Sequence, residues 1–186
     1  LARKLRPFAV PNVTLVLIFG QVLVYVATRS NAELLNNTLL IPERVLQGEF
    51  WRLVTFLFVP PDTSAIFAFI FWYLFYLMGT ALENTWGVFR YNLFLLIGFA
   101  ATTAVAFLYP ALPASNGFVQ GSVFLAFAFL FPDFVLHLFF ILPVKIKWLA
   151  LIAWLGYLHT LVMGLWPVKL FVLASVCNFL LFFGKD

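Results

Sequence analysis

The sequence predicts an all-α integral membrane protein. Hydrophobic residues make up 65% of the chain and charged residues only 10%, and the mean hydropathy is +1.06. A soluble globular chain is about half apolar and a quarter charged. Six apolar stretches, most of them near the roughly 20 residues that a helix needs to cross a bilayer, fill most of the chain. We therefore expect a single membrane domain over residues 1–186.

The apolar stretches are expected to be helices. In lipid every backbone polar group must be satisfied internally, which an isolated strand cannot do. The fourth stretch is the shortest. The six predicted spans are 11–28, 65–82, 91–108, 117–131, 146–164 and 167–183.

The positive charges predict that both ends of the chain lie on the cytoplasmic side. With the N-terminus inside, seven Lys and Arg residues fall on cytoplasmic segments and four on the other side, which agrees with the positive-inside rule. The cytoplasmic set is Arg3, Lys4, Arg6, Arg90, Lys145, Lys147 and Lys185, and the other set is Arg29, Arg44, Arg52 and Lys169.

Two connecting segments are expected to be more than linkers. The loop 29–64 mixes apolar residues with charges, so part of it should form short helices that lie in the outer interface. The segment 132–145 contains an apolar run that is too short to cross, and we expect it to dip into the inner interface.

A series of short motifs resembles the rhomboid superfamily, and within it the rhomboid-like and derlin-like branch. Gly48-Glu49-Phe50-Trp51-Arg52 resembles the Trp-Arg motif of the first loop. Gly79-Thr80-Ala81-Leu82-Glu83, followed by Gly87 and Arg90, resembles the pattern that joins spans two and three. Gln120-Gly121-Ser122-Val123-Phe124 resembles the Ser-Gly-Ala-Val-Phe phrase of the protease active site. The resemblance covers roughly residues 47–183 and implies a six-helix rhomboid-like bundle.

The resemblance also implies that the catalytic pair is missing. Rhomboid proteases use a Ser on span four and a His on span six, and these positions correspond to Gln120 and Ser175. A carboxamide cannot act as the nucleophile, and without a base the Ser-His mechanism fails. We expect no catalytic residues and a pseudoprotease.

Four polar residues are predicted to line a cavity open to the outer side. At about 1.5 Å per residue, Gln120 and Ser122 lie about 4–8 Å deep. By the same rise His159 lies about 8 Å deep and Ser175 about 12 Å. Polar groups inside a bilayer usually face the bundle interior or a water-filled cavity. These residues would bind a segment of another membrane protein, or would only form hydrogen bonds with one another without lining a pocket. The similar depth of Ser122 and His159 also leaves a Ser-His dyad open.

The remaining motif residues are expected to be structural. Trp51 and Arg52 anchor the first loop, or else snorkel to the interface as such residues commonly do. Glu83 and Arg90 pair, or cap the two helices around Gly87. Gly117 and Gly121 have the small-xxx-small spacing that lets helices approach closely, and are expected to bury span four in its own bundle.

The function expected from the resemblance is client binding by an inactive rhomboid-like protein in quality control or trafficking. Its partners would be membrane lipid and transmembrane client proteins. Two alternatives stay open: an active intramembrane serine protease with an altered site, and a small-solute transporter. The sequence contains no Cys cluster, no His-x-x-x-His and no Gly-rich phosphate loop, so no metal, cofactor or nucleic acid is expected. The lack of a long additional domain favours a bacterial inner membrane.

Overall fold

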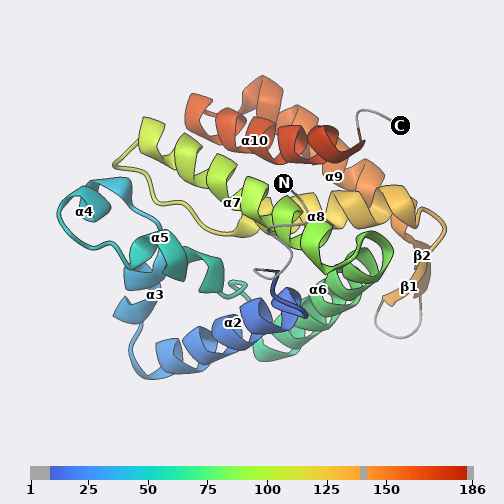
Figure 1. Ribbon diagram of the computed structural model, residues 1–186, viewed down its shortest axis with the longest axis horizontal. Helices are drawn as coiled ribbons and strands as arrows, with labels where there is room; N and C mark the ends of the chain where they lie inside the picture. The colour runs from blue at the N-terminus through green and yellow to red at the C-terminus, as the bar shows by residue number, and fades with distance from the viewer. Residues whose placement is uncertain (1–8, 139–141, 184–186) are drawn as a thin grey trace.

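The computed structural model describes residues 9–138 and 142–183 and has a helix at each of the six predicted spans (Figure 1). Their ends differ from the predicted ones by only a few residues, and the largest change is the extension of the second span to Trp86. Arg3, Lys4, Arg6 and Lys185, which support the predicted topology, lie outside the described residues. The helices are α2 (Val13–Ser30), α6 (Ala65–Trp86), α7 (Val88–Leu108), α8 (Gly117–Leu130), α9 (Ile146–Met163) and α10 (Trp166–Phe183).

Helix α8 lies at the centre of the bundle and packs against α6, α7, α9 and α10. It has 14 residues, of which seven are buried. Its neighbour α9 has 18 residues and buries only one of them, Ile146. Within residues 9–138 and 142–183, five helices are long and apolar enough to cross a membrane, and α8 is a shorter apolar helix. The chain is therefore an all-α membrane protein by its architecture, with its central helix sheltered from the surroundings by the others.

The loop after α2 folds into short helices at one end of the bundle, as expected (Figure 1). It joins the rest of the protein at the start of α8. The backbone of Leu40 exchanges two hydrogen bonds with that of Ala114, and the buried Asn116 amide donates to the carbonyls of Leu57 and Val59. The loop thereby covers the first turn of the central helix. Its elements are α3 (Glu33–Thr38), α4 (Pro42–Leu46), α5 (Arg52–Thr55) and the 3₁₀ turn η2 (Phe56–Phe58).

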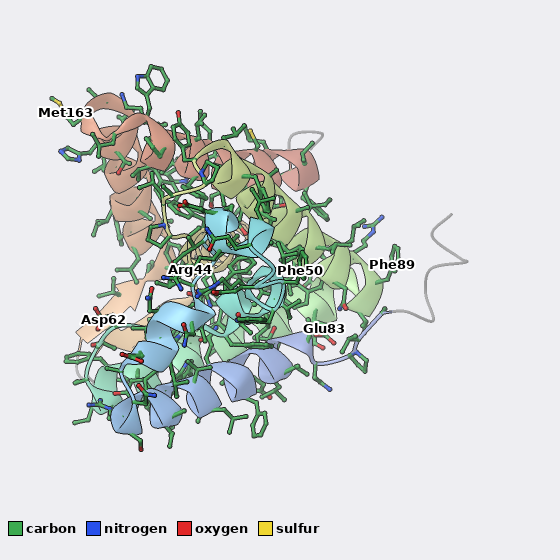
Figure 2. All side chains as sticks on the ribbon, turned by 90° about the vertical axis from the view of Figure 1, so that its left-hand side faces the viewer. Arg44, Phe50, Asp62, Glu83, Phe89 and Met163 are labelled. Carbon is green, nitrogen blue, oxygen red and sulfur yellow. The ribbon has the colours of Figure 1, made fainter. Side chains whose placement is uncertain are left out.

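Helices α6 and α7 are joined by the single residue Gly87. Its φ of 80° lies in the region that glycine adopts without a steric penalty. The prediction that Glu83 and Arg90 form an ion pair is wrong. The Glu83 carboxylate accepts a hydrogen bond of 2.9 Å from the Asn12 backbone N–H, and Arg90 is exposed. A carboxylate stabilises unpaired amides near a helix start, whereas an exposed ion pair contributes little. Figure 2 shows Glu83 and Phe89 on either side of this turn, at the opposite edge of the molecule from Met163.

The segment after α8 forms an antiparallel hairpin, which the sequence did not predict. Strands β1 (Val135–Leu138) and β2 (Leu142–Lys145) pair from Val135 opposite Lys145 to Leu138 opposite Leu142. The Asp133 carboxylate ties the hairpin base to α9 by accepting hydrogen bonds from Lys145 (3.1 Å) and Lys147 (2.9 Å). The hairpin lies at the end of the bundle opposite α3–α5 (Figure 1).

The Asp133 contact predicts a pH-dependent hairpin. The hydrogen bonds from Lys147 and Lys145 hold the pKa of Asp133 below its ordinary value. Because the folded pKa is the lower one, the stabilisation is present above the unfolded value of about 3.9 and is lost as the pH falls through the folded pKa. Amide hydrogen exchange in β1 and β2, corrected for intrinsic rates, should therefore quicken in acid. Asp133→Asn should exchange quickly at both pH values, and an unchanged acid response in that variant would contradict the assignment.

Candidate functional site

The hydroxyl of Ser122 is held between two other helices in the bundle interior. It donates to the Val119 carbonyl at 2.7 Å and accepts from the Asn178 amide nitrogen at 3.2 Å. Ser122 and Asn178 are each 1% exposed. A nucleophilic serine donates its hydrogen bond to a base that removes the proton, whereas this hydroxyl donates its hydrogen bond to a backbone carbonyl, which is no base. Ser122 is therefore arranged as a structural hydrogen-bonding group.

A glycine on α7 makes room for this pair. A Cβ at Gly98 would lie 2.9 Å from the Asn178 amide nitrogen and 3.8 Å from the Ser122 hydroxyl. Small residues allow membrane helices to approach closely. Helix α7 thus packs directly against the contact between Ser122 of α8 and Asn178 of α10.

The second polar contact joins α10 and α8 one turn away. Ser175 is buried and donates to the Phe118 carbonyl at 3.1 Å. A Cβ at Gly121 would overlap the Tyr157 hydroxyl of α9 and would lie 3.9 Å from the Ser175 hydroxyl. Gly121 therefore admits α9 to the centre of the bundle. Gly117 does not share this role, because a Cβ there would meet only Ser115 of the preceding loop, at 3.6 Å.

Two amide atoms on α8 and α10 are buried without a hydrogen-bond partner. They are the amide nitrogen of Gln120 and the amide oxygen of Asn178. Most buried polar groups in proteins are hydrogen-bonded, and one left unpaired costs about 1–3 kcal/mol. Asn178 therefore has a free acceptor beside Ser122, and Gln120 has a free donor on α8.

The structure does not bring His159 to Ser122. His159 is exposed on α9, whereas Ser122 is enclosed by α7, α8 and α10. The interpretation of Ser122 and His159 as a dyad is therefore wrong, and so is the placement of His159 in the cavity. Similar depth did not imply proximity, because depth says nothing of the direction in which a residue faces around its helix.

Where an open cavity was expected, the structure has a polar cluster of Ser122, Tyr157, Ser175 and Asn178, called here the α8 cluster. Gln120 lies on the same helix as Ser122, next to Gly121. Two hollows in the described part of the chain, one between α8 and α9 and one beside Gly87, are lined by residues outside this cluster. Sequence analysis missed Tyr157 and Asn178 as members. Asn178 was detectable, since an amide three residues after Ser175 in an apolar helix is expected to face the bundle interior.

Arg52 is the centre of the first loop. Its side chain is completely buried and bonds to the Glu49 carboxylate. It also donates to the carbonyls of Asn36 (2.6 Å) and Leu39 (2.9 Å) and to the Asn37 amide oxygen (3.4 Å). Trp51 beside it is 55% exposed. Arg52 therefore holds α3 against α5 and does not snorkel, whereas Trp51 projects from the protein. Figure 2 shows Arg44 and Phe50 of the same loop in front of the bundle.

The described residues contain no group of three or more His, Cys, Asp or Glu side chains that could hold a metal ion. Comparison of the chain with protein-family models, with curated proteins and with solved structures gives no match. What the fold and hydropathy define is a class: a multi-pass, all-α membrane protein with a polar cluster around its short central helix.

Proposed function

We propose that this protein is a catalytically inactive rhomboid-like membrane protein that binds transmembrane or membrane-proximal segments of client proteins, in a quality-control or trafficking role. The observation that carries the proposal is the α8 cluster. An amide stands at the position that resembles the protease nucleophile, and the neighbouring Ser122 is committed to Val119 and Asn178. The site keeps polar groups for recognition and lacks an activated nucleophile.

The positions of the two histidines support the loss of catalysis. A general base must lie about 2.6–3.2 Å from the proton that it removes, or reach it through one water. The chain has two His residues. His159 is exposed on α9, and His137 belongs to β1 in the hairpin that follows the far end of α8. His159 is not a hydrogen-bond partner of Ser122 or Ser175.

The unpaired Gln120 amide nitrogen supports a binding role. Its cost of about 1–3 kcal/mol is removed when a client supplies a carbonyl or a polar side chain. Helix α9 is the neighbour of α8 with the fewest buried residues, since it buries only Ile146. Displacement of α9 from Gly121 would expose this part of α8 sideways, so a client with a polar or partly unwound helix would gain a hydrogen bond from Gln120.

The test is photo-crosslinking from Leu158, an exposed residue next to Tyr157, with Gln120 present or replaced by Leu. We expect adducts with membrane segments of other proteins, and a several-fold fall in their yield in Gln120→Leu, because that change removes the donor. A crosslinker at Leu180, on the exposed side of α10, is the matched control and should be insensitive to Gln120→Leu. Equal yields in both backgrounds at Leu158 would contradict the proposal.

Labelling with a fluorophosphonate checks the inactive state of the same preparation. We expect none, because the Ser122 hydroxyl donates its hydrogen bond to a backbone carbonyl and not to a base. Labelling that disappears in Ser122→Ala would show an active protease. A transporter would be expected to have helices broken at mid-membrane, and the continuous α6, α7, α9 and α10 give no support to this alternative. Protein-dependent solute uptake into proteoliposomes would restore it.

A further inference from the structure

A groove between α8 and α9 lies outside the α8 cluster, toward the hairpin end of the molecule. Its volume is about 230 Å³, below the roughly 300–1,000 Å³ of ordinary small-molecule sites. Leu125, Ala128 and Phe129 line it from α8, and Lys147, Ala150 and Trp154 line it from α9. Phe129 is 54% exposed and Trp154 is 38% exposed. The groove is therefore apolar and open sideways, with Lys147 as its one charged lining residue.

The width of the groove excludes a client helix. A helix with its side chains is about 10–12 Å across, which a hollow of this volume cannot enclose. Its floor is aromatic: the ring of Phe179 on α10 lies 5.6 Å from that of Phe129 and 6.1 Å from that of Trp154. A flexible hydrocarbon chain fits a narrow apolar slot of this kind, and burying each CH₂ group contributes about 0.8 kcal/mol.

The mouth of the groove carries excess positive charge. Lys145 and Lys147 both bond to the single carboxylate of Asp133, so one positive charge is left unbalanced. Both lysine side chains remain nearly half exposed, at 48% and 44%. Trp148 next to them is 56% exposed, and Trp is typical of the region where hydrocarbon meets headgroups. Basic pockets between membrane helices bind anionic lipid headgroups.

We propose that this groove is a binding site for an anionic phospholipid, with one acyl chain between α8 and α9 and the phosphate at Lys147 and Lys145. The lipid comes from the leaflet at the hairpin end of the molecule. The site is distinct from the α8 cluster and does not depend on client binding or on the loss of catalysis.

The test uses the full protein reconstituted with phosphatidylglycerol and phosphatidylcholine, then extracted in detergent and passed through a sizing column. Mass spectrometry counts the lipid that stays bound. We expect phosphatidylglycerol to be enriched several-fold over its share of the mixture. Lys147→Gln should lower the enrichment several-fold. Lys169→Gln, the same charge change at the far end of α9 and α10, should leave it unchanged.

Asp133→Asn separates lipid binding from a structural role of the lysines. It frees both lysines, so we expect phosphatidylglycerol retention to rise. If Asp133→Asn and Lys147→Gln both lower retention, the lysines act by holding the hairpin and the proposal is overturned. Lys147→Arg keeps the charge and should keep the enrichment, which guards against a variant that fails because it misfolds.

A larger side chain in the groove tests whether an acyl chain lies there. Ala150→Phe should abolish retention of the lipid, whereas Leu155→Phe adds bulk to an exposed position of α9 and should have no effect. Retention unchanged by Ala150→Phe, or equal retention of the two lipid classes by the wild-type protein, overturns the proposal. So does displacement of the lipid by inorganic phosphate alone, because the site would then recognise a free anion.

Discussion

Replacing Arg52 with alanine is expected to lower the free energy of unfolding by about 3–5 kcal/mol, the usual cost of removing one partner from a buried ion pair. Arg52 is completely buried and bonds to Glu49 and to the carbonyls of Asn36 and Leu39. The substitution leaves these acceptors without a donor and creates a cavity between α3 and α5. Denaturant titration in mixed micelles, followed by tryptophan fluorescence, measures the loss.

Arg44 provides the matched control for this prediction. It pairs with the same carboxylate, Glu49, at 3.6 Å, but its side chain is 47% exposed. An exposed pair contributes about 0–1 kcal/mol, so Arg44→Ala should cost far less than Arg52→Ala. Lys in place of Arg52 has only one ammonium group and cannot span all the acceptors, so Arg52→Lys should remain strongly destabilised. Equal losses in Arg44→Ala and Arg52→Ala would show that burial of Arg52 does not stabilise the loop.

The second large effect is expected at Gly79 of α6. A Cβ there would overlap the Thr14 side chain of α2 and lie 2.7 Å from the Tyr91 hydroxyl of α7. Thr14 and Tyr91 are hydrogen-bonded at 2.7 Å in the bundle interior. Gly79→Ala must therefore push α2 away or break this bond. We expect a loss of about 1–3 kcal/mol, as for other overpacked interiors, measured by the same titration.

The matched control is Gly156→Ala on α9, which is not expected to lower the free energy of unfolding. A Cβ at Gly156 has nothing within 4 Å. Alanine is favoured over glycine in a helix interior by roughly 0.5–1 kcal/mol, so Gly156→Ala should be neutral or stabilising. If both variants lost stability equally, the close approach of α2 to α6 would not be the cause.

The helices could be predicted from the sequence because hydropathy and length alone set their bounds. The start of α8 at Gly117 and of α9 at Ile146 agree with the prediction. The hairpin could not be predicted, because a short apolar run does not distinguish a strand pair from an interfacial segment. A helix that is apolar all round also has no periodicity to show which face is inward, which is why His159 was placed wrongly.

The polar contacts were harder to predict because they join residues far apart in the chain. Ser122 and Asn178 are 56 residues apart, and Arg52 reaches carbonyls 13 and 16 residues before it. Sequence identifies a costly polar residue in an apolar stretch, but its partner depends on how the helices rotate against one another. The Trp-Arg motif therefore identified Arg52 as a structural residue without revealing that it bonds to backbone carbonyls.

The brevity of α8 has a consequence for the surrounding lipid. Its 14 residues extend about 21 Å at 1.5 Å per residue, against a hydrocarbon core of about 30 Å. A span shorter than the core favours a locally thinner bilayer. Because α6, α7, α9 and α10 pack around α8, contacts with protein take the place of part of the lipid that a longer helix would meet.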